Sequence, residues 1–171
     1  MNTVFDIAGI RALSPENSRI TMEGDFPVLY VTEDGAEVRC GIFEAKRAFP
    51  FEKEEEFIVL LSEDGGDLGL IRRLSDRPDA EREILKRELD RRYFMPVIEK
   101  ILHVNEKFAF SYWKVKTSSG PLEFSVRDTY KSLIHLGKRI IVTDADGNRY
   151  DIPDVSKLDK ASRKKIDLYL W

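Results

Sequence analysis

Short runs of apolar, β-favouring residues recur along the chain, and each leads through a polar turn with glycine into a second such run. Glycine adopts positive φ angles without a steric penalty, and Asp, Asn and Ser side chains bond locally to the backbone, so each unit is typical of a β-hairpin. The four units span residues 28–42, 57–71, 112–126 and 139–152. A fifth hairpin is predicted between residues 97–104 and 108–113, across the turn Asn105-Glu106-Lys107.

A different period governs residues 79–93, where apolar side chains recur three and four positions apart and predict an amphipathic helix. The stripe consists of Ala80, Ile84, Leu85, Leu89 and Tyr93. Acidic residues at its start and arginines at its end suit the helix dipole, and Pro96 predicts that the helix ends at or before residue 95. A second, shorter helix is predicted over residues 159–170, with Asp159 as its N-cap.

This order of elements, with two hairpins before the long helix and further hairpins after it, predicts an α+β fold with mostly antiparallel sheet. We expect residues 1–25 to form an N-terminal extension and residues 26–171 to form a single domain. An alternative organisation of that domain has two β-rich halves, residues 26–75 and 97–153, joined by the helix. Around Gly41 the apolar positions switch parity, which predicts a bulge or bend in that strand.

Charge is unevenly distributed along the 171 residues, which carry 28 basic and 31 acidic side chains for a net charge of −3. Residues 1–70 carry 15 acidic and 6 basic side chains, whereas residues 71–171 carry 16 acidic and 22 basic ones. The total excludes a generally basic protein that coats nucleic acid, and no pair of aromatic residues on adjacent predicted strands resembles an RNA-recognition signature. Nucleic acid is therefore not expected as a partner.

Two charged segments are the least neutralised by their sequence neighbours, and they are the candidate interaction patches. The acidic residues are Glu52, Glu54, Glu55 and Glu56, and the basic residues are Lys157, Lys160, Arg163, Lys164 and Lys165. The first segment would dock a basic partner, and the second an anionic partner such as RNA or a layer of lipid headgroups. The alternative is that both are solvated faces, the acidic run also guarding the apolar strand 57–61 against aggregation.

No motif in the sequence predicts a reaction. Cys40 has no cysteine partner, and His103 and His135 stand outside the close ligand pairs that are typical of zinc sites. Neither the nucleophile elbow Gly-x-Ser-x-Gly nor the phosphate loop Gly-x-x-x-x-Gly-Lys-Ser/Thr occurs. We therefore expect no catalytic, cofactor-binding or metal-ligating residues, and no cofactor.

The longest uninterrupted apolar stretch, residues 57–61, is far below the roughly 20 residues that a membrane span needs. Residues 1–13 lack the basic and long apolar regions of a signal peptide, and a single cysteine fits a reducing compartment. We expect a cytoplasmic protein without direct membrane insertion.

Three stretches of sequence carry a family resemblance when they are taken together. They are Arg47-Ala48-Phe49-Pro50, the run Arg92-Tyr93-Phe94-Met95-Pro96-Val97-Ile98, and residues 141–154 followed by Leu158-Asp159 and Ser162-Arg163. This combination resembles an uncharacterised bacterial domain family labelled as associated with cyanophycin metabolism. The resemblance covers most of the chain from about Phe26 onward. Domains of that family are similar to ones found at the end of, or encoded beside, ABC-type transporter proteins, and the family has no established catalytic residues.

The resemblance implies a non-enzymatic accessory or ligand-binding domain that acts with an ABC-type transporter. Cyanophycin has an aspartate backbone with arginine side chains, so carboxylates in the acidic first part of the chain would attract the guanidinium group of a small peptide or amino-acid ligand. Two alternatives stay open. One is a hydrolase or other enzyme of cyanophycin or peptide metabolism whose carboxylate site has no sequence signature, and the other is a structural homodimer module.

Overall fold

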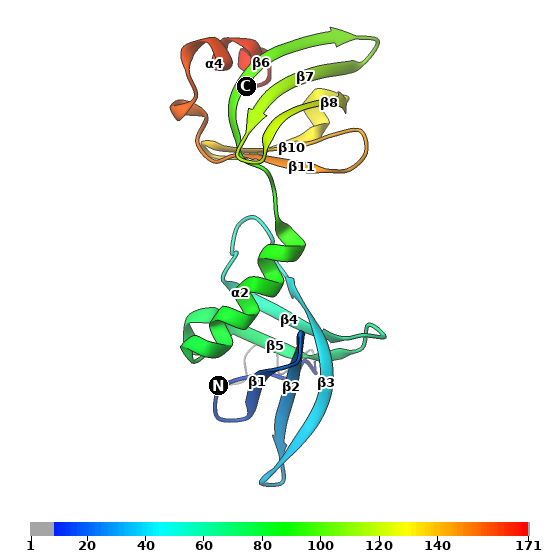
Figure 1. Ribbon diagram of the computed structural model, residues 1–171, viewed down its shortest axis with the longest axis vertical. Helices are drawn as coiled ribbons and strands as arrows, with labels where there is room; N and C mark the ends of the chain where they lie inside the picture. Colours follow the sequence, from blue (N-terminus) through cyan, green and yellow to red (C-terminus); the bar gives the residue numbers. More distant parts are fainter. Residues whose placement is uncertain (1–8, 171) are drawn as a thin grey trace. The chain divides into compact units, whose positions relative to one another are not determined.

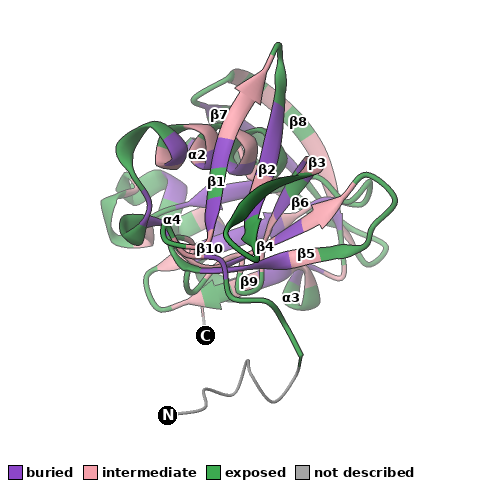
Figure 2. Cartoon of the chain, turned by 90° about the horizontal axis from the view of Figure 1, so that it is seen from below, coloured by how far each residue is buried: buried purple, intermediate pink, exposed green. Residues whose placement is uncertain are grey.

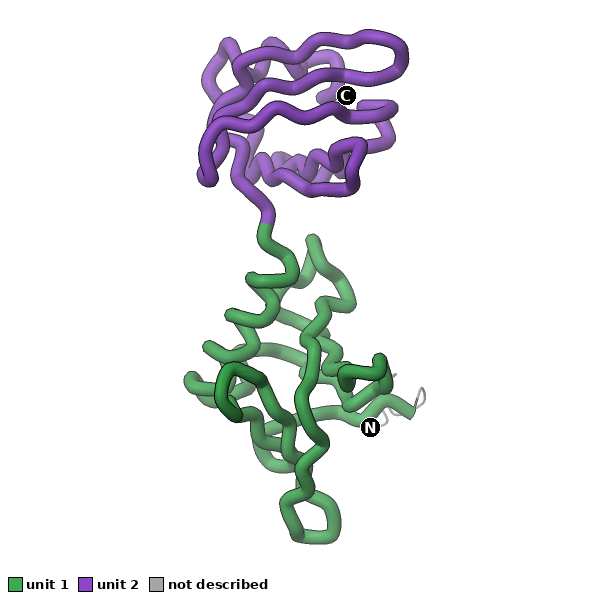
Figure 3. The backbone as a smooth tube through the Cα atoms, turned by 45° about the vertical axis from the view of Figure 1, so that its right-hand side comes forward, with its two compact units in different colours: residues 1–94 green, residues 95–171 purple. Residues whose placement is uncertain are grey.

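The backbone of the computed structural model, which describes residues 9–170, divides into two units, Met1–Phe94 and Met95–Trp171 (Figures 1 and 3). Each unit has its own hydrophobic core. Figure 2 shows that burial concentrates on the strands and that exposure concentrates on the connections between them. The helices and the antiparallel pairing of the strands in each sheet confirm the predicted α+β class.

The first unit is built on a five-stranded antiparallel sheet in which every strand pairs with its neighbour in sequence. Its strands are β1 (Ser18–Glu23), β2 (Phe26–Glu33), β3 (Ala36–Arg47), β4 (Glu56–Ser62) and β5 (Asp67–Arg73). The first part of β3 pairs with β2 and its second part with β4, so one long strand serves both halves of the sheet. The register of β2 against β3 shifts beside Gly41, which confirms the irregularity predicted there.

The segment that precedes β1 covers the open edge of β5. Leu13 donates its backbone N–H to the carbonyl of Leu70 at 2.8 Å, and Leu70 donates to the carbonyl of Arg11 at the same distance. Residues 18–23 lie inside the stretch that the sequence analysis set apart as an extension, yet they form strand β1, and Ile20 belongs to the core. Residues 1–8 of that stretch lie outside the described part of the chain.

Helix α2 (Asp79–Tyr93) packs on this sheet and coincides with the predicted long helix. Leu85 and Leu89 of its apolar stripe are fully buried among core residues of the strands, including Phe43. A short 3-10 helix, η1 (Leu74–Asp76), precedes it. Because α2 contacts β1 and β3, it belongs to the first unit.

The second unit contains two three-stranded antiparallel sheets, ordered β6-β7-β8 and β11-β10-β9. The strands are β6 (Ile98–Lys107), β7 (Phe110–Thr117), β8 (Gly120–Arg127), β9 (Leu133–Leu136), β10 (Arg139–Thr143) and β11 (Arg149–Ile152). Their core includes an aromatic stack in which the ring of Phe124 lies 6.0 Å from Trp113 and 4.2 Å from Tyr150, measured between centroids.

Helices in the second unit match the prediction only in part. The C-terminal region predicted as residues 159–170 forms α4 (Lys160–Ile166) and a 3-10 turn, η3 (Asp167–Tyr169), with Asp159 accepting from the backbone N–H of Ser162 at 2.9 Å as the expected cap. Two short helical elements of this unit were not predicted, namely α3 (Thr129–Ser132) and η2 (Val155–Lys157), and neither was the short strand β9. A four-residue helix is too short to display a helical period.

Among the described residues, no helix combines the length and the apolar character that crossing a membrane would require.

The turn between β10 and β11 is organised by Asp144, a buried carboxylate. It accepts hydrogen bonds from the backbone N–H groups of Asp146 and Asn148 at 2.9 and 2.8 Å, from the Asn148 amide at 3.0 Å and from the Tyr150 hydroxyl at 2.9 Å. Burial opposes ionisation of Asp144, but these hydrogen bonds together outweigh it, so the pKa of Asp144 lies below its usual value. Burial and the bond to Asp144 raise the pKa of Tyr150 to about 12.

Replacing Asp144 with asparagine is expected to destabilise the second unit by about 1–3 kcal/mol near neutral pH, because a charged acceptor of four hydrogen bonds is lost. A carboxyl whose pKa is lowered by folding contributes stability that is present above its unfolded pKa, roughly 3.9, and is lost as the pH falls through the folded value. The variant should therefore show a flatter dependence of unfolding temperature on pH in the acid range. Thermal unfolding followed by tryptophan fluorescence at several pH values measures this, and parallel curves for both proteins would contradict it.

Candidate functional site

The acidic candidate patch lies in the loop between β3 and β4 and is partly neutralised within its own unit. Lys53 approaches Glu56 at 3.8 Å, and Lys86 of α2 approaches Glu55 at 3.4 Å. The backbone carbonyl of Glu54 accepts from the Arg47 side chain at 2.9 Å. Glu52 is exposed. The patch therefore carries less free charge than its sequence indicates.

The basic candidate patch lies in the second unit, on η2 and α4. Lys157 belongs to η2, and the other four residues, Lys160, Arg163, Lys164 and Lys165, lie on α4. Ser162 anchors this helix at the edge of β6, where its hydroxyl accepts the backbone N–H of Ile101 at 2.9 Å. Lys165 donates to the carbonyl of Ala161 at 3.0 Å, whereas Lys160, Arg163 and Lys164 form no ion pair with another residue in the described range 9–170. The two candidate patches belong to different units.

A hollow of about 280 Å³ lies in the first unit where the last turns of α2 meet β3. Its lining is apolar at Phe43 and Ala45 and charged at Glu44, Glu88, Arg91 and Arg92. Next to it the Tyr93 hydroxyl accepts the backbone N–H of Arg47 at 3.0 Å, and the Arg47 guanidinium lies 4.9 Å from the Tyr93 ring centroid. Two of the stretches that carry the family resemblance therefore meet beside the hollow.

Some charged side chains of this hollow form close ion pairs, whereas Glu88 does not. Arg92 donates to Glu44 at 2.5 Å, which is a close ion pair. In contrast, the buried Oε1 of Glu88 accepts no hydrogen bond from any residue that the structure describes. The guanidinium groups nearest to its two oxygens, those of Arg87 and Arg91, both stay 3.8 Å away.

The Glu88 oxygen without a hydrogen bond and the exposed Arg91 guanidinium together indicate which chemical groups a ligand of this hollow would carry. Glu88 can accept from an ammonium or guanidinium group, and Arg91, whose side chain is 69% exposed, can bind a carboxylate through two parallel hydrogen bonds. Phe43 and Ala45 provide an apolar surface for the stem that joins such groups. The hollow is therefore suited to a small molecule that carries both charges, such as an amino acid or a dipeptide.

These residues are not predicted as a site from the sequence, because alternating charges on a helix are typical of paired side chains on a solvated face. One signal was present. Glu88 lies four residues after Ile84 and three after Leu85, so it falls on the apolar stripe rather than opposite to it. A charged residue on such a stripe is buried at a cost unless it is paired or bound.

Metal chemistry has no candidate centre in the described residues, since no group of three or more His, Cys, Asp and Glu side chains there is arranged to hold an ion.

The fold and the hollow define a two-unit α+β protein with a small, mixed-charge site on its first unit. The chain belongs to the family described as "Domain of unknown function (DUF1854)", whose model matches residues 42–169. The match begins within β3 and includes every residue that lines the hollow. Comparison with curated proteins and with solved structures gives no match.

Proposed function

We propose that this protein is a cytoplasmic, non-enzymatic accessory domain that binds a small zwitterionic ligand and acts with an ABC-type transporter. The ligand class is an amino acid or short peptide with a cationic and an anionic group, and the arginine- and aspartate-containing products of cyanophycin belong to this class. The site is the hollow between β3 and α2.

The observation that carries the proposal is the buried, unsatisfied Oε1 of Glu88 in a hollow that Arg91 also lines. A buried carboxylate oxygen without a hydrogen bond is unfavourable, because its lost hydration is not replaced. A donor from a ligand removes this penalty at the moment of binding. The carboxylate of the same ligand then meets Arg91, whose only ion-pair contact in the described structure is the distant one with Glu88.

The transporter part of the proposal rests on the resemblance between this chain and domains that accompany ABC-type transporters. Co-purification with tagged transporter subunits from the same cells tests it directly. Absence of this chain from such complexes, together with unchanged transport in a strain without it, would remove this part and leave ligand binding to be judged separately.

Isothermal titration with aspartyl-arginine dipeptide tests the ligand part. We expect the intact protein to bind the dipeptide and Glu88→Gln to bind it about 10- to 100-fold more weakly, which corresponds to one charge-assisted hydrogen bond. Arg91→Gln should weaken binding of the dipeptide but should affect an arginine amide less, because the amide lacks the free carboxylate.

The matched control is Glu83→Gln, which removes the same charge from an exposed position of α2 and should leave the titration unchanged. No heat at millimolar dipeptide, or equal affinities for Glu88→Gln and Glu83→Gln, would reject the site. Release of free arginine during the titration would instead favour the enzyme of peptide metabolism over the binding domain.

A further inference from the structure

The tip of the β6–β7 hairpin presents an aromatic side chain to solvent on an unfavourable backbone. Phe108 and Ala109 form the turn with φ angles of 51° and 62°, values that residues other than glycine rarely adopt. The Phe108 side chain is 86% exposed, so little burial of its ring compensates for this conformation. A bulky apolar residue in such a turn is costly to the isolated protein and points to a role outside its own fold.

Two basic residues, Lys107 and Arg127, line the groove at this tip. A groove of about 650 Å³ runs beneath it between the β6–β7 turn and the start of α3, and its lining includes Lys107, Phe110, Arg127 and the exposed ring of Tyr130. The Lys107 ammonium lies 5.5 Å from the centroid of the Phe108 ring. Within residues 9–170, neither Lys107 nor Arg127 takes part in an ion pair.

The acidic groups of the same groove are already occupied. Asp128 pairs with Lys131 at 2.7 Å, and Glu106 accepts a hydrogen bond from the Tyr169 hydroxyl. The groove therefore presents Lys107 and Arg127 beside exposed aromatic rings. Of its two acidic residues, Asp128 is neutralised by Lys131, and Glu106 is held by the neutral Tyr169 hydroxyl.

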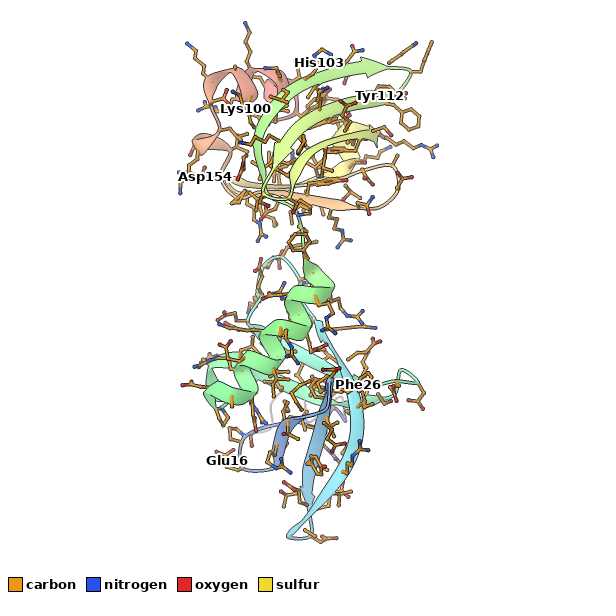
Figure 4. All side chains as sticks on the ribbon, viewed as in Figure 1. Glu16, Phe26, Lys100, His103, Tyr112 and Asp154 are labelled. Carbon is orange, nitrogen blue, oxygen red and sulfur yellow. The ribbon has the colours of Figure 1, made fainter. Side chains whose placement is uncertain are left out.

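Positive charge continues from the groove along the solvent-exposed face of the β6-β7-β8 sheet. The register places Lys100 opposite Lys116, which is a pair of like charges, and Lys114 follows on the same face of β7. Figure 4 labels Lys100, His103 and Tyr112 on these strands. Like charges directly opposite each other on one face destabilise a sheet. Glu123 lies 2.6 Å from Lys114, and Asp159 interacts electrostatically with Lys100. An anionic surface against this face would relieve the repulsion that these two acidic residues leave.

We infer that the second unit docks on a membrane surface that contains anionic lipids, with the Phe108 ring in the headgroup layer and Lys107 and Arg127 on lipid phosphates. Aromatic rings are favoured at this interface, and each basic residue near an anionic leaflet adds to binding. The most exposed aromatic ring among residues 9–170 lies at the hairpin tip rather than on the sheet face, which favours entry into an interface over stacking on a nucleic-acid strand. This inference is independent of the hollow in the first unit and places the protein where a transporter would be found.

Co-sedimentation with phosphatidylcholine vesicles, with and without phosphatidylglycerol, tests the inference on the full chain. We expect binding only to the vesicles that contain phosphatidylglycerol, and we expect salt to weaken it because exposed charges are screened. Phe108→Gly should reduce the binding about tenfold or more, since the apolar burial of one phenylalanine is lost. Glycine accepts the positive φ angle, so this variant should fold at least as stably as the parent.

Matched controls come from the first unit. Phe26→Ser removes an exposed phenylalanine and Lys86→Gln removes one surface charge, and both variants should bind vesicles as the parent does. In contrast, Lys107→Gln and Arg127→Gln should each weaken binding. Equal binding to vesicles without phosphatidylglycerol, or unchanged binding of Phe108→Gly, would overturn the inference. Tight binding of a single-stranded RNA oligonucleotide that is lost in the same variants, without vesicle binding, would also overturn it and would make nucleic acid the partner of this face.

Discussion

Arg77→Ala is expected to destabilise the first unit by about 3–5 kcal/mol, because it leaves a largely buried carboxylate without its partner. The Arg77 side chain has no exposed surface and donates to Glu81 at 2.7 Å, to the Ser18 hydroxyl at 3.0 Å and to the Ser18 carbonyl at 3.1 Å. Glu81 in turn accepts the backbone N–H of Ile20 at 3.1 Å. This network ties the start of α2 to β1, so its loss should loosen both elements together.

Urea unfolding followed by fluorescence and by circular dichroism distinguishes a loss of stability in the first unit from one in the second. Trp113 is buried in the core of the second unit, so its fluorescence reports on that unit, and Trp171 lies outside the described residues. Far-UV circular dichroism reports on both units. Arg77→Ala should lower the urea midpoint in the circular dichroism signal and leave the fluorescence transition in place.

Two further variants distinguish the effect of breaking the buried Arg77–Glu81 pair from the effect of removing any surface arginine. Arg82→Ala removes an arginine whose partner, Asp79, is highly exposed, and it should cost less than about 0.5 kcal/mol. The double variant Arg77→Met, Glu81→Leu should be more stable than Arg77→Ala alone, because no unpaired charge is left buried. An Arg77→Ala protein as stable as Arg82→Ala would contradict the role assigned to this network.

Gly69→Ala should destabilise the first unit by about 2–5 kcal/mol through overpacking and backbone strain. Gly69 has a φ angle of +149°, and a Cβ atom there would lie 2.7 Å from Cγ of Leu13 and 2.8 Å from the carbonyl oxygen of Arg11. The carbonyl cannot retreat without breaking its hydrogen bond from Leu70. The substitution should therefore detach residues 11–13 from the edge of β5.

The control for Gly69→Ala is Gly24→Ala, which has a φ angle of +61° and open space around the added Cβ. It measures backbone strain alone and should cost about 1–2 kcal/mol. Amide hydrogen exchange at Leu13 and Leu70 should accelerate in Gly69→Ala and stay unchanged in Gly24→Ala. Equal losses of stability in the two variants would show that close packing at Gly69 plays no part.

Much of the local structure was predictable, because turn residues and side-chain periods act over a few positions. The hairpin turn that contains Gly147 and the helix α2 follow from such short-range signals. Strand β1 was missed because only its pairing with β2 and the burial of Ile20 make it a strand. Helix α3 was missed because it has only four residues and begins after Asp128, which adopts a left-handed backbone conformation and donates its backbone N–H to the distant Ala109 carbonyl.

The candidate sites were less predictable than the fold. The sequence identifies charged segments, but it does not say which charges become neutralised by residues far along the chain, as Lys86 neutralises Glu55. Glu88 carries the proposed ligand site and Phe108 the proposed membrane contact, and neither belongs to a known motif. Glu88 lies among alternating charges on α2, which are typical of a solvated face. Glu88 is identified by a buried oxygen without a hydrogen bond, and Phe108 by the exposure of its large ring.

The sequence by itself determined the α+β class, the hairpins, the long helix and the membership of an uncharacterised family. These depend on residue types within a short window or on similarity along the chain. The tertiary structure alone decided the division after Phe94, the hollow beside Glu88 and the exposed hairpin tip with its cations. The physical reason is that burial, register and hydrogen-bond satisfaction depend on side chains that meet only after the strands have paired and the helices have packed.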